Sequence, residues 1–134
     1  MLNASNDVTL INNLNNLQTQ DDSLMSSVNL PFSMHELNGA LSGCKKTSSP
    51  GPDQIDYNIL THLPSSSLQC LLNVVNSIWH SGEIPKDWKK SIIIPIPKNG
   101  KDPKNSKSYR PIALTSCIGK LMEHMVQKRL SWYL

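Results

Sequence analysis

Two cations in the C-terminal half of the chain have the spacing of a phosphate-binding site. Lys98 closes the apolar run Ile92–Ile96 together with Pro97, and Arg110 opens a second extended segment beyond a basic loop. A strand, a loop and a second strand would bring both side chains near the triphosphate of a nucleotide, and the planar fork of arginine binds phosphate oxygens in pairs. Two alternatives need no ligand: Lys98 can end its strand in solvent, and Arg110 can pair with Asp102 or Glu123.

The acidic residues, histidines and cysteines offer no comparable site. The one adjacent pair of acids, Asp21-Asp22, follows Thr19-Gln20 in a polar segment without a β-branched strand, which predicts a solvated loop. No metal-ligand spacing exists among the four histidines and three cysteines, and the sequence has no C-x-x-C pair. We therefore expect no catalytic residue, no metal site and no cofactor bound by this chain.

The three tryptophans could stack on nucleic-acid bases, but their surroundings favour packing. Trp79 belongs to an apolar helical stripe and Trp132 to a terminal helix, so we expect both to pack. Trp88 lies among Lys86, Lys89 and Lys90, where stacking remains the minority interpretation.

Charge is segregated along the 134 residues. Every charged residue before Lys45 is acidic, whereas eleven of the thirteen Lys and Arg residues lie in residues 86–134. Such a basic end suits a polyanion, although a solvated basic face is the simpler explanation. Three widely spaced cysteines favour buried thiols in a reducing compartment. No basic leader and no long apolar run is present, so we expect a soluble, intracellular protein, with nucleus or cytoplasm left open.

The polar residues 1–30 predict a weak helix or a disordered lead-in, and the ordered domain is expected over residues 31–134. Ser33 and Glu36 have the spacing of a capping box that begins a helix. Residues 45–53 contain two prolines and predict a defined turn, after which Asp53 is expected to cap a short helix. Residues 65–81 carry the clearest helical stripe, with Gly82 placed to end it.

The remaining residues predict a hairpin followed by a helix. Pro95 and Pro97 are two residues apart, so their missing N–H groups lie on one side and the strand must pair through the other. The expected partner is Tyr109–Leu114, across the basic loop of residues 99–108. Ser116 or Thr115 then caps a final helix whose apolar positions are Ile118, Leu121, Met122, Met125 and Trp132. This helix and that of residues 65–81 are expected to form a core beneath the hairpin.

Three phrases of the sequence resemble the reverse transcriptases of non-LTR (LINE-type) retrotransposons, the jockey-like group most closely. They are A-L-S-G-C-K-K-T-S-S-P-G-P-D-Q-I, N-S-I-W-H-S-G-E-I-P-K-D-W-K-K-S-I-I-I-P-I-P-K and S-Y-R-P-I-A-L-T-S-C-I-G-K-L-M-E. The resemblance runs from Pro31 to Leu134. It implies an α+β fold, the mostly helical, partial fingers subdomain of a right-hand polymerase with a small antiparallel hairpin, without palm or thumb.

The resemblance also implies residue roles. Lys98 and Arg110 match the residues that contact the phosphates of the dNTP in that family. The turn of Ser49, Pro50, Gly51, Pro52 and Asp53 matches an N-terminal extension that lies near the RNA template. The metal-binding aspartates of the family, which hold Mg²⁺ in the intact enzyme, have no match in this sequence.

The resemblance thus predicts a fragment of an RNA-directed DNA polymerase from a mobile element, inactive alone, whose partners in the intact enzyme are RNA template and dNTP. A partial gene model, a decayed copy and a domesticated remnant would all fit. Two alternatives remain. One is a non-catalytic, basic nucleic-acid-binding remnant or domesticated protein, and the other is a helical interaction protein with an exposed apolar face.

Overall fold

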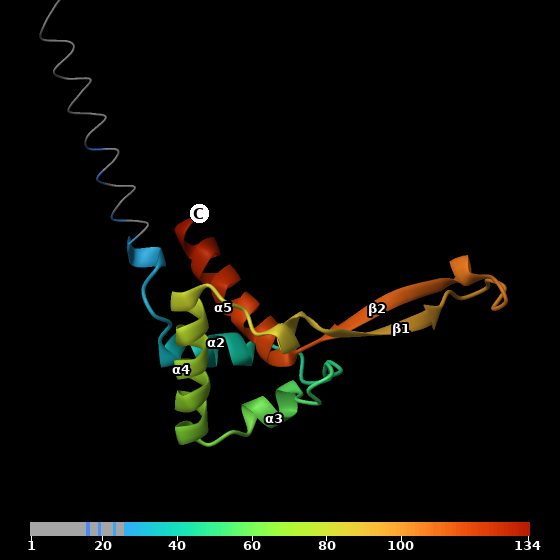
Figure 1. Ribbon diagram of the computed structural model, residues 1–134, viewed down its shortest axis with the longest axis horizontal. Helices are drawn as coiled ribbons and strands as arrows, with labels where there is room; N and C mark the ends of the chain where they lie inside the picture. The colour runs from blue at the N-terminus through green and yellow to red at the C-terminus, as the bar shows by residue number, and fades with distance from the viewer. Residues whose placement is uncertain (1–15, 17–18, 20–22, 24–25) are drawn as a thin grey trace, which may run out of the picture.

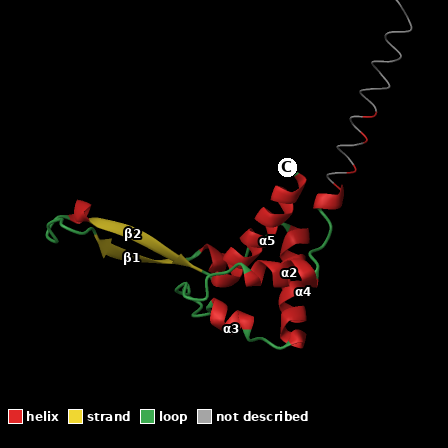
Figure 2. Ribbon diagram, turned by 180° about the vertical axis from the view of Figure 1, so that it is seen from behind, coloured by secondary structure: helices red, strands yellow, loops and turns green. Residues whose placement is uncertain are grey.

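The computed structural model describes residues 16, 19, 23 and 26–134, and it contains a helical body from which one hairpin projects (Figures 1 and 2). The helices are α2 (Met34–Ser42), α3 (Tyr57–Thr61), α4 (Ser65–Ser81) and α5 (Cys117–Tyr133), with short 3-10 helices η1 (Lys86–Lys89) and η2 (Ser106–Ser108). The strands are β1 (Ser91–Pro97) and β2 (Tyr109–Thr115). The α+β class is confirmed. Most of the predicted lead-in, Asp21-Asp22 included, lies outside the described residues.

Helix α2 begins at the predicted capping box. The Ser33 hydroxyl accepts a hydrogen bond from the Glu36 backbone N–H, and the Glu36 carboxylate accepts one from the Ser33 N–H at 2.8 Å. Leu37 and Ala40 are fully buried, and α2 packs against α3, α4 and α5. Residues of α4 and α5 share one core cluster, as the sequence predicted, and α2 contributes Leu37, Ala40 and Leu41 to the same cluster.

The residue that caps helix α3 lies three residues later than predicted. Asp56, and not Asp53, accepts the hydrogen bond of the Ile59 N–H, at 2.8 Å. Asp53 instead accepts from the Ile55 N–H within the preceding turn, at 3.2 Å. The sequence was ambiguous here because either aspartate can act as a cap, and the nearer one precedes the buried Tyr57 and Leu60.

Helix α4 has the predicted bounds. Leu72, Val75 and Ile78 are buried on its inner face, and Gly82 ends it in the left-handed conformation, with φ of 71°. The Trp79 ring meets Phe32 edge-on, with centroids 5.1 Å apart, which confirms the packing role predicted for this tryptophan.

Helix α5 begins at Ser116, whose hydroxyl accepts a hydrogen bond from the Gly119 N–H. Its buried positions Cys117, Leu121 and Met125 recur every four residues, and the next position in that series is Arg129. Trp132 does not pack into the core, because it lies off this stripe and is 80% exposed. Its prediction as a packed residue was wrong.

The Arg129 side chain is only 7% exposed and joins α5 to the start of the described body. Its Nε and Nη2 atoms donate to the two carboxylate oxygens of Glu36, at 2.8 and 2.9 Å. The remaining guanidinium protons reach the backbone oxygens of Val28, Leu30 and Pro31. The guanidinium also lies 3.8 Å from the centroid of the Phe32 ring, so every donor and one face of this cation are used.

The cysteines are free thiols, as expected from their spacing, but they are not all buried. Cys117 is buried and Cys44 is half-buried, whereas Cys70 is exposed on α4. Burial raises the pKa of both the Cys44 and the Cys117 thiols, which favours the protonated form over the thiolate. Within the described part of the chain, no helix is sufficiently long and apolar to span a membrane.

Candidate functional site

The hairpin pairs in the register that places both candidate cations on one face. β1 and β2 run antiparallel, with Ile96 opposite Arg110 and Ile94 opposite Ile112. Lys98 follows in the same register, because its N–H donates to the Ser108 oxygen at 2.7 Å. Residues opposite each other point to the same face and successive residues alternate. Lys98 and Arg110 therefore end one face, whose other members are Ile92, Ile94, Ile96, Ile112 and Leu114.

The prolines of the hairpin fit this register. The Lys98–Ser108 pair is hydrogen-bonded, and in an antiparallel ladder hydrogen-bonded and non-hydrogen-bonded pairs alternate. The adjacent pair, Pro97–Tyr109, is therefore not hydrogen-bonded. Pro95, Pro97 and Pro111 all fall in the pairs without hydrogen bonds. Their missing N–H groups would point away from the partner strand, so pairing is retained. The predicted edge strand and its partner are both confirmed, with Thr115 added to β2.

The Arg110 side chain is exposed and, among the described residues, makes no hydrogen bond or ion pair. It does not pair with Asp102 or Glu123, so that alternative does not describe the structure. Lys98 is half-buried, and its ammonium group donates to the Lys107 backbone oxygen at 2.9 Å. That bond uses one of three donors and leaves two for a ligand.

The turn of Ser49–Asp53 packs against the base of the same hairpin. Gly51 is buried there, and a Cβ atom at this position would lie 2.5 Å from the Thr115 carbonyl carbon and 2.6 Å from the Ser116 nitrogen. Only glycine allows backbone to approach backbone so closely. The turn is consequently fixed to the junction of β2 and α5, while Pro52 and Asp53 remain exposed.

The two groups of predicted site residues lie at opposite ends of the hairpin. Gly51 contacts Thr115 at the base of the hairpin, whereas Arg110 precedes Thr115 by five residues in β2. At the rise of an antiparallel strand, this separation along the hairpin is roughly 17 Å. The structure brings Lys98 and Arg110 together, but it does not bring the turn to them. A ligand that contacts both groups must span this length.

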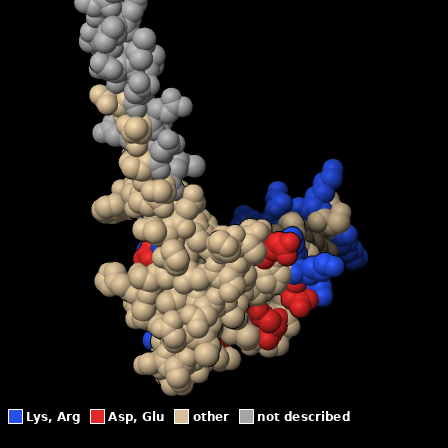
Figure 3. Space-filling model, turned by 60° about the vertical axis from the view of Figure 1, so that its left-hand side comes forward, with Lys and Arg blue, Asp and Glu red and all other residues tan. Residues whose placement is uncertain are grey.

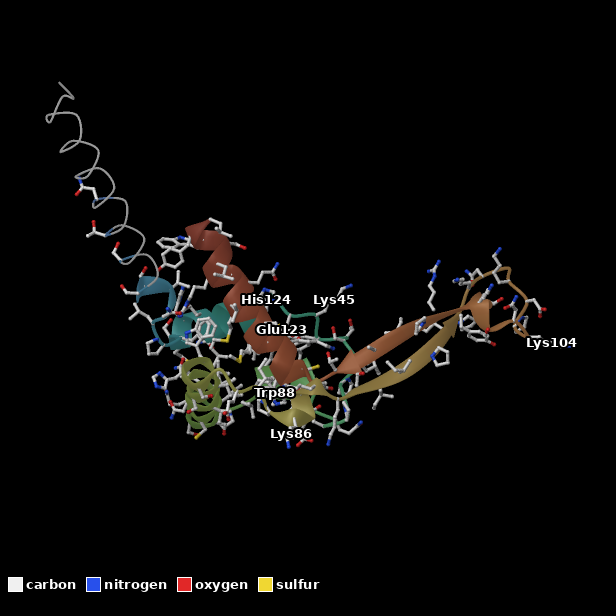
Figure 4. The ribbon with its side chains drawn as sticks, turned by 45° about the horizontal axis from the view of Figure 1, so that its top comes forward. Lys45, Lys86, Trp88, Lys104, Glu123 and His124 are labelled. Carbon is white, nitrogen blue, oxygen red and sulfur yellow. The ribbon has the colours of Figure 1, made fainter. Side chains whose placement is uncertain are left out.

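Trp88 packs at the base of the hairpin and not on an open basic surface. A Cβ atom at Gly119 would lie 3.6 Å from the Trp88 side chain. Trp88 also lines a groove of about 620 Å³, together with Trp79, Ile84 and Met122. Figure 4 shows Trp88 near the start of α5, with Lys86 directed away from the body. Packing is thus its role in this structure.

Lys and Arg side chains gather on the hairpin side of the molecule, while much of the helical body is uncharged on the face shown in Figure 3. Within the described residues the only ion pairs are Lys90–Asp87 and Arg129–Glu36, and neither involves the hairpin. No group of three His, Cys, Asp or Glu residues in that part of the chain could hold a metal ion. The site is cationic and has no carboxylate cluster.

The loop between the strands was predicted only to be basic, and no role was predicted for its individual lysines. Lys101, Lys104 and Lys107 are exposed in the loop between the two candidate cations. Their spacing was a visible signal, since Lys98, Lys101, Lys104, Lys107 and Arg110 recur at every third residue.

Sequence comparison finds relatives among the polymerases of mobile elements. The chain is 36% identical over 106 residues to the RNA-directed DNA polymerase from mobile element jockey of Drosophila melanogaster, a match that covers 77% of this chain and 12% of that protein. The corresponding polymerase of Drosophila funebris is 34% identical over 100 residues, covering 75% of this chain and 11% of that protein.

A relative with lower sequence identity belongs to a different retrotransposable element. The Pol polyprotein of type-1 retrotransposable element R2 of Popillia japonica is 30% identical over 102 residues, 75% of this chain and 13% of that protein. No protein-family model matches the chain. The chain thus spans about an eighth of the length of the curated relatives it matches.

Proposed function

Because this chain is a homologue of the RNA-directed DNA polymerases of non-LTR retrotransposons, jockey-like ones among them, we propose that it forms the fingers region of such an enzyme. In this role Lys98 and Arg110 bind the phosphates of the incoming dNTP. The turn of Ser49–Asp53 lies near the RNA template. The chain supplies contacts to both substrates and no catalytic group.

The observation that carries this proposal is the exposed, unpartnered Arg110 on the same hairpin face as Lys98. Two cations near each other repel, and no carboxylate of the described chain neutralises them. A triphosphate fits because its charge is compact and the guanidinium can bind two phosphate oxygens at once. Nucleotidyl transfer depends on such positioning and charge neutralisation of the pyrophosphate that leaves.

In polymerase sites Mg²⁺ is bound by one or two carboxylates together with the phosphates of the substrate. Among the described residues, no group of three His, Cys, Asp or Glu side chains could hold a metal ion. In our proposal the carboxylates that hold Mg²⁺ come from another part of the enzyme. The role of this chain is to orient the nucleotide and the template toward them.

The sharpest test replaces the hairpin of a complete homologous enzyme, together with the segment that precedes it, by residues 86–115 of this chain and then introduces Arg110→Ala. Hydrogen bonds to charged groups contribute about 1.5–3 kcal/mol, so kcat/KM for dNTP should fall roughly ten- to a hundredfold. Affinity for the RNA template should remain unchanged. A variant with weaker template binding and unaltered dNTP kinetics would show that Arg110 contacts the template instead.

Arg110→Lys is the matched control. Lysine keeps the charge but lacks the fork that binds two oxygens, so we expect an intermediate loss of dNTP efficiency. Lys90→Ala, which removes a cation already paired with Asp87 at 2.7 Å, should leave dNTP kinetics at the level of the parent chimera.

A further inference from the structure

The loop between the two strands has a regular series of cations. Residues 98–110 contain five Lys and Arg, each three residues from the next, and a single acid, Asp102. The proposed dNTP contact uses the first and the last of them. Lys101, Lys104 and Lys107 between these ends are exposed, and none of the three ammonium groups has a partner within the described chain.

Several side chains of residues 99–109 form hydrogen bonds with the backbone of the same loop. The Tyr109 hydroxyl donates to the Pro103 oxygen at 2.9 Å, and the Asn105 side chain accepts from the Lys107 N–H at 3.0 Å. The Asp102 carboxylate accepts from the Lys104 N–H at 3.0 Å. The one acid of the loop is thus used to shape the backbone and forms no ion pair with its lysines. These bonds leave the ammonium groups of the loop lysines available to a ligand.

The tip of the loop lies away from the helical body (Figure 4). Lys104 lies at the tip of the hairpin, at the far end from the helices (Figure 4). By contrast, Lys128 donates to the Gly39 oxygen at 2.7 Å, and Lys90 and Arg129 are in ion pairs. The loop therefore concentrates positive charge where no part of the described chain neutralises it, which favours association with a polyanion.

We propose that Lys101, Lys104 and Lys107 bind the phosphate backbone of a nucleic-acid strand, independently of its sequence. A single triphosphate is too compact for a series of five cations. Residues 99–108 contain no aromatic side chain on which a base could stack, so the proposed contact is made to phosphates. This inference rests on the proposed polymerase function and adds a strand contact that is distinct from the dNTP contact.

The test measures binding of this chain to a fluorescently labelled single-stranded RNA by anisotropy over a series of KCl concentrations. For single strands, log K falls against log salt by about 0.7 for each phosphate neutralised. The variant K101Q/K104Q/K107Q should therefore bind more weakly and show a slope smaller by about 2. Its thermal melt should match that of the unchanged chain, because all three side chains are exposed.

The matched control is K86Q/K89Q/K90Q, which removes the same number of lysines from η1 and its C-cap residue. Its slope should change by less than that of the loop variant. Equal changes in both variants, no change in the loop variant, or no binding by the unchanged chain at low salt would each overturn the proposal. Single-stranded DNA of the same sequence should give a similar slope, and binding restricted to RNA would overturn a contact made to phosphates alone.

Failure here is distinguishable from failure of the proposed function. The loop variant is measured by strand affinity, whereas Arg110→Ala in the complete enzyme is measured by dNTP efficiency. A normal salt slope in the loop variant together with a dNTP defect in Arg110→Ala would reject the strand contact and retain the fingers assignment.

Discussion

The helical body and the hairpin of this chain differ in how much apolar surface they bury and in whether their cations have partners. The body buries Leu37 completely, uses every donor of Arg129 and closes its core around α2. The hairpin carries five isoleucines that are each at least 40% exposed, together with cations that have no partner. A two-stranded hairpin gains little stability by itself. The difference indicates that the body provides the stability of the fold, whereas the hairpin presents apolar and cationic side chains to a binding partner.

The largest expected effect comes from the core of the body. Leu37→Ala should lower the free energy of unfolding by about 2–5 kcal/mol, the usual cost of emptying a buried leucine site. Ile93→Ala, in a side chain that is 58% exposed, should change it by less than about 0.5 kcal/mol. Urea unfolding measures both. A similar cost for the two variants would remove the distinction between the regions.

Arg129 should come next. Arg129→Met keeps much of the volume but loses the charged hydrogen bonds to Glu36, each of which contributes about 1.5–3 kcal/mol in typical proteins. We expect a loss of stability of that order. Lys128→Met, one residue earlier and with a single bond to the Gly39 oxygen, is the control and should cost less. Thermal melting that ranks the two in the opposite order would show that the Arg129 contacts do not stabilise the body.

Gly51→Ala probes the boundary between the regions. An added methyl group would press on the Thr115 and Ser116 backbone, and overpacking of this kind costs about 1–3 kcal/mol. Gly39→Ala is the matched control, since nothing lies within 4 Å of the added atom and alanine favours helix α2. The control should be neutral or more stable in urea unfolding. If both substitutions proved neutral, the turn would not be fixed to the hairpin base.

The smallest effect depends on pH. Partial burial raises the pKa of Glu36, but hydrogen bonds from Ser33 and Arg129 outweigh it and hold that pKa below its ordinary 4.5. A depressed carboxyl pKa stabilises the folded state above pH 4.5, and this contribution is lost as pH falls through the folded value. The stability difference between the unchanged chain and Glu36→Gln should therefore shrink below pH 4.5. A constant difference in melting temperature from pH 7 to 3 would contradict this.

The hairpin could be predicted because local rules determine it. Pro95 and Pro97 specify which side of the strand can pair, and Ser33, Ser116 and Gly82 mark where helices begin or end. These signals act within a few residues. They predicted the pairing of the two strands and the bounds of α4 without knowledge of tertiary packing, although the cap of α3 was misplaced by three residues.

Tertiary contacts could not be read in the same way. Arg129 looks like one more surface cation, and its burial depends on Glu36 and Phe32, about ninety residues earlier. Trp132 looks like a core residue, yet α5 turns it outward once Arg129 takes the inner position. For the candidate site, the sequence indicated the residue types and the shared hairpin face. It did not show that the Ser49–Asp53 turn meets the opposite end of that hairpin.

The placement of the three hairpin prolines has one more consequence. An isoleucine-rich strand with free edges is a template for edge-on addition of further strands, which leads to aggregation. Pro95 and Pro97 remove two outward donors from β1, and Pro111 removes one from β2. Neither outer edge of the hairpin therefore has the full set of backbone N–H donors that an additional strand would need for pairing. The hairpin can thus leave its isoleucine faces open to a partner while resisting growth into a larger sheet.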